Sequence, residues 1–142
     1  MPNLLALYFA LPGLRLCMPL GHVTKVLALM ALQEVPSAPQ HFVGLLNLGG
    51  EAVPVIDLGR HLQRPAFAWH TDTPVVLCET NGRRCGLVVE SVDGVRLVSG
   101  RRRRVDEVVR DTQAPFVTVF DNGDGLVFML DTEAVLADLL PA

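Results

Sequence analysis

The 142-residue sequence is poor in charge and poor in cysteine. Only 19% of its residues are charged and half are apolar, which argues against an intrinsically disordered chain. The three cysteines are an odd number without a C-x-x-C spacing, so a disulfide framework is not expected and a reducing compartment is favoured. The length suits one domain with a substantial core.

A long uninterrupted apolar run is also missing. Arg15, Lys25, Glu34 and Glu51 break the apolar N-terminal third too often for a membrane-spanning helix. The N-terminus has neither a basic n-region nor a small-x-small cleavage site, which argues against a secretory signal. We therefore expect a soluble, cytoplasmic protein.

Recognisable catalytic and metal-binding motifs are missing as well. His22, His41, His61 and His70 lack the H-x-x-x-H and H-E-x-x-H spacings and stand apart from clustered cysteines or carboxylates, so we expect no metal and no other cofactor. Asp57 lies in V-I-D-L-G, without the hydroxyl residue of an aspartic protease motif, and is better explained as a helix cap. The sequence therefore predicts a protein that is not an enzyme.

Glycines and prolines are spread along the chain, a distribution typical of short strands joined by turns. The clearest hairpin surrounds Asn81-Gly82, because both central positions of its turn favour positive φ. This hairpin would place Glu79 opposite Arg84 and Cys78 opposite Cys85. The two thiols could bridge in that geometry, although two small buried cysteines are the simpler interpretation.

Two further hairpins follow from the same pattern. Gly49-Gly50 separates F-V-G-L-L-N-L from E-A-V-P-V-I-D-L, and residues 116–120 can pair with 126–130 around a glycine-containing turn. Repeated short strands with glycine-rich turns favour barrels or a sandwich. The chain also holds more apolar residues than a barrel of this size requires, which suggests a surface for protein–protein contact.

Helices are expected at only two places. Asp57 can cap the short turn L-G-R-H-L-Q, and Asp131 can cap a helix over 132–140 that presents one apolar face. Residues 17–28 are ambiguous by composition, and we interpret them as mostly strand.

A run of four arginines, Arg101–Arg104, stands out in a chain of net charge −3. Asp106, Glu107 and Asp111 follow closely, so a charge-balanced, solvated loop and a functional basic patch both remain possible interpretations. The acidic net charge argues against a general nucleic-acid binder.

Taken together, the ordered segments resemble the CheW-like domain family over residues 4–140. The segments are V-T-K-V (23–26), V-P-S-A-P (35–39), G-L-L-N-L-G-G-E-A-V-P-V-I-D-L (44–58), G-L-V-V-E-S-V-D-G-V (86–95) and F-M-L-D-T-E-A-V-L (128–136). The resemblance implies an all-β fold of two small SH3-like five-stranded β-barrels on a shared core, with a short C-terminal helix. It places the first barrel mainly within 4–66, a linker at about 64–74, the second barrel mainly within 75–130 and the helix at 132–140.

The resemblance also implies a function. It predicts a non-catalytic chemosensory adaptor that couples the cytoplasmic tip of a methyl-accepting chemoreceptor to the regulatory domain of a CheA-type histidine kinase, as part of a two-component system. A divergent member that serves a pilus or surface-sensing system is a variant of this hypothesis. The alternative from another class is an SH3-like barrel module that binds nucleic acid through Arg101–Arg104.

Two sets of site residues follow from the family pattern. A receptor-binding groove would include Val23, Val26, Val88 and Val89, and a kinase or partner interface would include Lys25, Gly49, Gly50 and Glu51. Strand alternation predicts that one of Val88 and Val89 faces the core. Gly49 stands where the family has the arginine of N-L-R-G and Lys25 where it has the glutamate of V-x-E-I, positions that can form an ion pair in the family.

Overall fold

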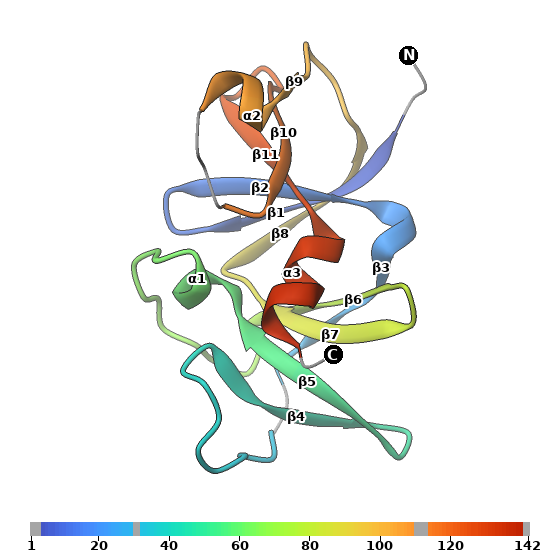
Figure 1. Ribbon diagram of the computed structural model, residues 1–142, viewed down its shortest axis with the longest axis vertical. Helices are drawn as coiled ribbons and strands as arrows, with labels where there is room; N and C mark the ends of the chain where they lie inside the picture. The colour runs from blue at the N-terminus through green and yellow to red at the C-terminus, as the bar shows by residue number, and fades with distance from the viewer. Residues whose placement is uncertain (1–3, 30–31, 110–113, 141–142) are drawn as a thin grey trace.

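The computed structural model describes residues 4–29, 32–109 and 114–140 (Figure 1). Its strands form two sheets, which we call sheet A and sheet B. Sheet A has the order β8–β1–β2–β11–β10–β9, with bounds β1 Leu5–Leu11, β2 Leu14–Pro19, β8 Ser91–Leu97, β9 Arg103–Arg104, β10 Phe116–Asp121 and β11 Leu126–Leu130. Sheet B has the order β3–β6–β7–β5–β4, with bounds β3 Val23–Ala28, β4 Phe42–Leu48, β5 Glu51–Asp57, β6 Pro74–Thr80 and β7 Arg83–Val88.

Helices are short and few among the described residues. They are the 3-10 turn η1 Leu20–His22 and the α-helices α1 Leu58–His61, α2 Val105–Val108 and α3 Thr132–Leu139. None of them is long and apolar enough to cross a membrane. The predicted all-β class with a short C-terminal helix is confirmed, and so is the largely extended conformation of 17–28.

The sheets divide the chain differently from the predicted barrels. Sheet A combines strands from 5–19 with strands from 91–130, whereas sheet B is built from 23–88. The reason is long-range pairing: β1 pairs with β8, and β2 pairs in parallel with β11. The segment 64–74 therefore joins two parts of sheet B and is not a linker between barrels, which corrects the boundaries expected from the sequence.

Local turn chemistry explains the three predicted hairpins, all of which are confirmed. Asn81 and Gly82 both have positive φ, at 53° and 77°, as a two-residue hairpin turn requires. The register that follows places Cys78 opposite Cys85 and Glu79 opposite Arg84.

Side-chain caps start the two predicted helical turns. The Asp57 carboxylate accepts a hydrogen bond from the Arg60 backbone N–H at 3.1 Å, and Asp131 accepts one from Ala134 at the same distance. Each bond satisfies a backbone donor that has no partner inside its helix. Asp57 thus has a structural task at the start of α1, as the sequence predicted.

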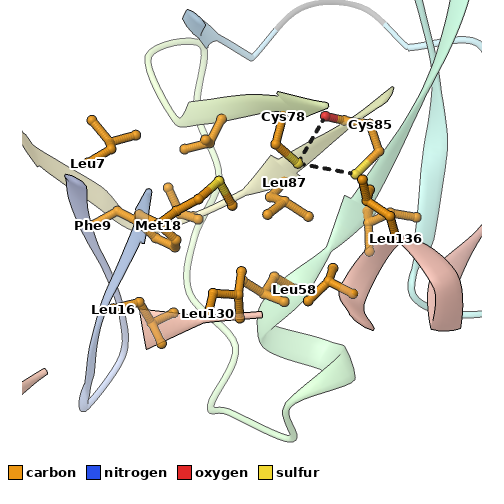
Figure 2. Packing of buried hydrophobic residues seen from close by; sticks show 14 of the residues in the cluster. Leu7, Phe9, Leu16, Met18, Leu58, Cys78, Cys85, Leu87, Leu130 and Leu136 are labelled. Carbon is orange, nitrogen blue, oxygen red and sulfur yellow. Dashed lines mark hydrogen bonds between the residues drawn. The ribbon is translucent and has the colours of Figure 1, made fainter. Parts of the chain in front are cut away.

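Buried apolar side chains form three clusters, one between the sheets and one on the other face of each sheet. The largest lies between the sheets, where Phe9 and Met18 of sheet A meet Leu87 of sheet B and Leu136 of α3 (Figure 2). The second cluster uses the other face of sheet A, and the third uses the other face of sheet B. Much of the apolar surplus noted in the sequence is therefore internal.

Candidate partner-binding surfaces

Strand β3 forms one edge of sheet B and carries Val23 and Val26. Val23 stands opposite Cys78 and Val26 opposite Val76, and both partners belong to the cluster between the sheets. Opposed residues of an antiparallel pair share a face, so the two valines point toward the inter-sheet side. Simple alternation would separate residues three apart, but the register shift between Val23 and Lys25 brings them onto one face.

Strand β8 forms one edge of sheet A. Val95 stands opposite Leu7, a member of the inter-sheet cluster, and Leu97 stands opposite Leu5. Val95, Leu97 and Leu5 are nevertheless exposed, at 46%, 50% and 47%, as is Val26 at 40%. The inter-sheet faces of both sheets thus end in solvent-exposed apolar side chains. We call these four residues, together with the partly buried Val23 that packs against the same core, the two-edge surface.

Val88 and Val89 lie elsewhere. Both have no exposed area, since Val88 belongs to the cluster on the far face of sheet B and Val89 to the cluster between the sheets. The two side chains point to opposite faces of sheet B, as strand alternation predicts. Each face packs against its own buried cluster, so neither side chain reaches the surface. This corrects their assignment to a receptor groove.

The β4–β5 turn places Gly49, Gly50 and Glu51 together at one end of sheet B. Both glycines have positive φ, at 62° and 90°, and the Asn47 carboxamide oxygen accepts a hydrogen bond from the Gly50 N–H at 2.9 Å. A Cβ on Gly49 would meet no atom within 4 Å, so the left-handed backbone, and not lack of space, favours glycine there.

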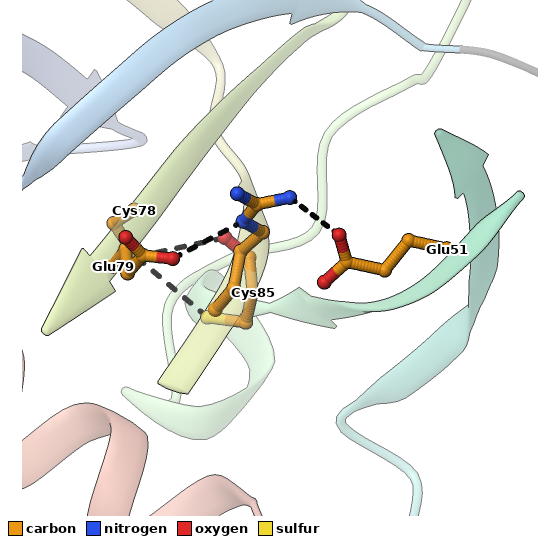
Figure 3. Close-up of polar contacts among 5 residues, drawn as sticks. Glu51, Cys78, Glu79 and Cys85 are labelled. Atoms are coloured by element: carbon orange, nitrogen blue, oxygen red, sulfur yellow. Dashed lines mark hydrogen bonds and ion pairs between the residues drawn. The ribbon is translucent and has the colours of Figure 1, made fainter. Parts of the chain in front are cut away.

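A short row of charges crosses three strands beside this turn. Arg84 on β7 binds Glu51 on β5 at 2.8 Å, and its Nε lies 3.4 Å from Glu79 on β6 (Figure 3). The Nε is buried without good hydrogen-bond geometry, so the Glu51 contact is the stronger of the two. Arg84 is a candidate interface residue that the sequence placed only opposite Glu79, because its contact with Glu51 depends on the parallel β5–β7 pairing of distant segments.

Lys25 is exposed on β3 and stands opposite Leu77, which belongs to the far-face cluster of sheet B. It therefore points away from the side occupied by Val26. In the described part of the chain, Lys25 takes part in no salt bridge. Of the predicted kinase-interface residues, Gly49, Gly50 and Glu51 are brought together, and Lys25 lies on a different strand.

The arginine run is only partly a loop. Arg103 and Arg104 form β9, which pairs with β10, and Arg104 binds Asp106 at 2.8 Å. This ion pair agrees with the charge-balanced interpretation, and it is exposed and hence weak. Asp111, the third acidic residue of the prediction, lies outside the described residues.

The three cysteines are buried free thiols. The Sγ atoms of Cys78 and Cys85 are 3.7 Å apart, and their hydrogen bond together with burial raises the pKa of Cys85. Burial raises the pKa of Cys17 to about 12. Thiols held protonated in this way are poor nucleophiles. Among the described residues, no three histidine, cysteine or acidic side chains are grouped closely enough to hold a metal ion.

Comparison with known proteins gives one consistent result. Residues 5–140 match the family model described as the CheW-like domain. The chain is 26% identical over 119 residues to a chemotaxis protein CheW of Bacillus subtilis, covering 80% of this chain and 76% of that protein. It is 25% identical over 85 residues to a CheW of Rhizobium meliloti, covering 60% of this chain and 55% of that protein.

The fold agrees with this result. A crystal structure of the scaffolding protein TtCheW from Thermoanaerobacter tengcongensis superposes with a TM-score of 0.81 at 20% identity, covering 91% of this chain and 89% of that one. The two chains therefore share the same fold. The chain belongs to the CheW-like domain family, whose members are non-catalytic scaffolding adaptors of chemotaxis.

Proposed function

We propose that this adaptor couples the cytoplasmic tip of a methyl-accepting chemoreceptor to the regulatory domain of a CheA-type histidine kinase. Family membership supports the scaffold role. The two-edge surface is the single observation that carries the receptor contact, because exposed apolar side chains there continue the core between the sheets. A helical hairpin tip binds in this way when its apolar residues enter a surface with aliphatic walls.

The receptor contact is assigned to Val23 and Val26 of β3 with Val95 and Leu97 of β8. These four side chains come from one edge strand of each sheet. The proposed receptor tip lies against both edge strands at once. Contact with both sheets gives the tip more apolar area than either edge offers alone, and apolar area is the main source of affinity at the centre of an interface.

The kinase contact is assigned to the end of sheet B at Gly49, Gly50 and Glu51, with Lys25 as a further contact on β3. The salt bridge to Arg84 holds Glu51 in one orientation, which lowers the conformational cost of binding. The receptor and kinase contacts then use different faces, so both partners bind at the same time. Three free thiols are consistent with the reducing cytoplasm as the place of this function.

Reconstitution from purified components tests the proposal. The chain is mixed with a receptor-tip fragment and a kinase regulatory domain from the same cell, and complexes are separated by size-exclusion chromatography. The proposal predicts a peak that contains all three proteins, whereas receptor and kinase mixed without the chain elute apart. Elution of the chain separately from both partners would contradict it.

A divergent member of the family would bind its own kinase better than a kinase of the standard system. The double variant Lys25→Glu with Gly49→Arg restores the residues that the family pattern has at these positions. Improved binding to a standard kinase domain would support divergence, and no gain would count against it. The single variants serve as controls, because Arg at a left-handed position costs about 1 kcal/mol by itself.

A further inference from the structure

The segment 64–73 carries the only tryptophan of the chain, and neither proposed contact uses it. Trp69 is 36% exposed, and its ring lies 6.4 Å from the ring of Phe67. Two cavities lie beside it, one of about 520 Å³ and one of about 550 Å³, and Trp69 lines both. We call the two cavities together the Trp69 cleft.

The cleft is preformed, because its segment is fixed at both ends. The Arg64 guanidinium donates two hydrogen bonds to the Pro12 carbonyl, at 2.7 and 3.0 Å. At the other end the buried Thr73 hydroxyl accepts from the His70 N–H at 2.8 Å, and the Thr73 carbonyl accepts from the Leu29 N–H at 2.8 Å. A rigid site loses little conformational entropy when it binds a ligand.

The opposite wall is fixed as well. Gln33 and Leu45 exchange two backbone hydrogen bonds of 2.9 Å, which hold the segment before β4 against that strand. Arg60 Nη1 lies 3.5 Å from the Gln40 carbonyl, at the long limit of a hydrogen bond, and so connects the walls of the two cavities. The cavities therefore adjoin and can be bridged by one extended chain.

The two cavities differ in chemistry. The larger is lined by apolar residues that include Leu29, Leu32 and Phe42, by the polar Ser37 and Gln40, and by the exposed Glu34. The smaller is lined by Arg60 and Arg64, and its one acidic residue, Asp57, already caps α1. In the described part of the chain, no salt bridge neutralises Arg60, which is exposed. A ligand carboxylate would satisfy this guanidinium.

We propose that the Trp69 cleft binds an extended segment of a partner protein in which an aliphatic or aromatic residue stands next to a carboxylate. The apolar side chain enters the larger cavity against Trp69, and the carboxylate pairs with Arg60 in the smaller one. Trp69 and Arg60 are of the residue types that carry most of the affinity in protein interfaces.

This contact is separate from the proposed kinase contact. The cleft uses the start of β4 and the end of β5, whereas Gly49 and Gly50 join the other ends of the same two strands. A strand of this length spans roughly 20 Å. The inference does not depend on the receptor or kinase assignments, so variants of the cleft leave both of those contacts intact.

Panning a random peptide display library on the full chain tests the proposal. We expect enriched peptides to place aspartate or glutamate next to a large apolar residue. Anisotropy of a labelled enriched peptide should show about tenfold weaker binding to Trp69→Ala and to Arg60→Glu. Arg103→Glu, which reverses an exposed arginine on sheet A, is the matched control and should bind like the wild type.

Other outcomes would overturn the proposal. These are no enrichment above an unrelated protein, enrichment without acidic residues, or peptides whose affinity survives both cleft variants. Self-association of the wild type that Trp69→Ala abolishes, measured by sedimentation velocity, would instead assign the cleft to a second copy of this chain. Thermal unfolding of each variant confirms that a loss of binding is not a loss of fold.

Discussion

Val26 and Val76 stand opposite each other on neighbouring strands, yet Val76 has no exposed area and Val26 is 40% exposed. The pair marks the place where the core between the sheets reaches the surface at strand β3. The same change occurs on sheet A, where the buried Leu7 stands opposite the exposed Val95. Two sheet edges that both leave apolar side chains uncovered are the basis of the proposed receptor contact.

Val26→Asp should abolish binding of a receptor-tip fragment and leave the fold intact. A charge at this position must be desolvated when an apolar helix tip covers it, which costs more than the contact contributes. The exposed position limits the change in unfolding free energy to about 0.5 kcal/mol. Val117→Asp, at an exposed valine on β10, is the control and should bind normally. If Val26→Asp binds the receptor fragment as well as the wild type does in a pull-down, then β3 is not part of the receptor contact.

Arg84→Ala should weaken kinase binding more than it weakens the fold. The salt bridges of Arg84 are partly exposed, so their loss should lower the unfolding free energy by about 0.5–1 kcal/mol. Without Arg84, Glu51 is no longer held beside the β4–β5 turn, and binding of the kinase regulatory domain should fall. Arg103→Ala, on sheet A, is the comparison. If both variants bind the kinase domain with equal affinity in a calorimetric titration, then the salt bridge from Arg84 to Glu51 does not contribute to kinase binding.

Asp57→Ala should destabilise the chain by about 1 kcal/mol, because the first turn of α1 loses its cap. Asp57→Asn should restore most of that stability, since an asparagine oxygen also accepts the hydrogen bond. Urea unfolding of the three proteins gives the comparison. A full loss with asparagine would mean that the negative charge matters, and the capping account would then be incomplete.

Burial of Cys17 predicts a loss of stability at alkaline pH. The pKa of this thiol is raised from its ordinary value of 9.0 to about 12 in the folded chain. As the pH rises, the Cys17 thiol ionises in the unfolded chain before it ionises in the folded one. The contribution of the protonated thiol to the unfolding free energy is therefore complete below pH 9.0 and is lost as the pH rises above that value. Urea midpoints should fall as the pH rises from about 9 to about 10, and Cys17→Ala should reduce the fall. A midpoint independent of pH in the wild type would contradict the burial of this group.

The local features of the fold could be predicted because short segments determine them. A two-residue hairpin turn requires positive φ at both of its central positions, and Asn81 and Gly82 both adopt it. This dipeptide therefore predicted the hairpin and its register correctly. Asp131 precedes a segment whose apolar residues recur at the spacing of a helix, and it caps α3 as expected. These interactions join residues a few positions apart, so nothing outside the segment had to be known.

Long-range pairing could not be predicted in the same way. The contact of β1 with β8 and of β2 with β11 joins segments that are distant in the sequence, and no local pattern identifies such partners. For the same reason the sequence could not show that Val88 meets a second core, or that Glu51 reaches Arg84. The register shift beside Thr24, which turns Val23 and Val26 to one face, also depends on pairing with β6.

Co-purification from the native cell tests the central claim most directly. The tagged chain, expressed at its natural level, should recover a chemoreceptor and a histidine kinase together after gentle lysis. The Val26→Asp variant should recover the kinase without the receptor, because the two contacts lie on different faces. Recovery of neither partner by the wild-type chain, or loss of both partners with Val26→Asp, would contradict the account of an adaptor with separate receptor and kinase contacts.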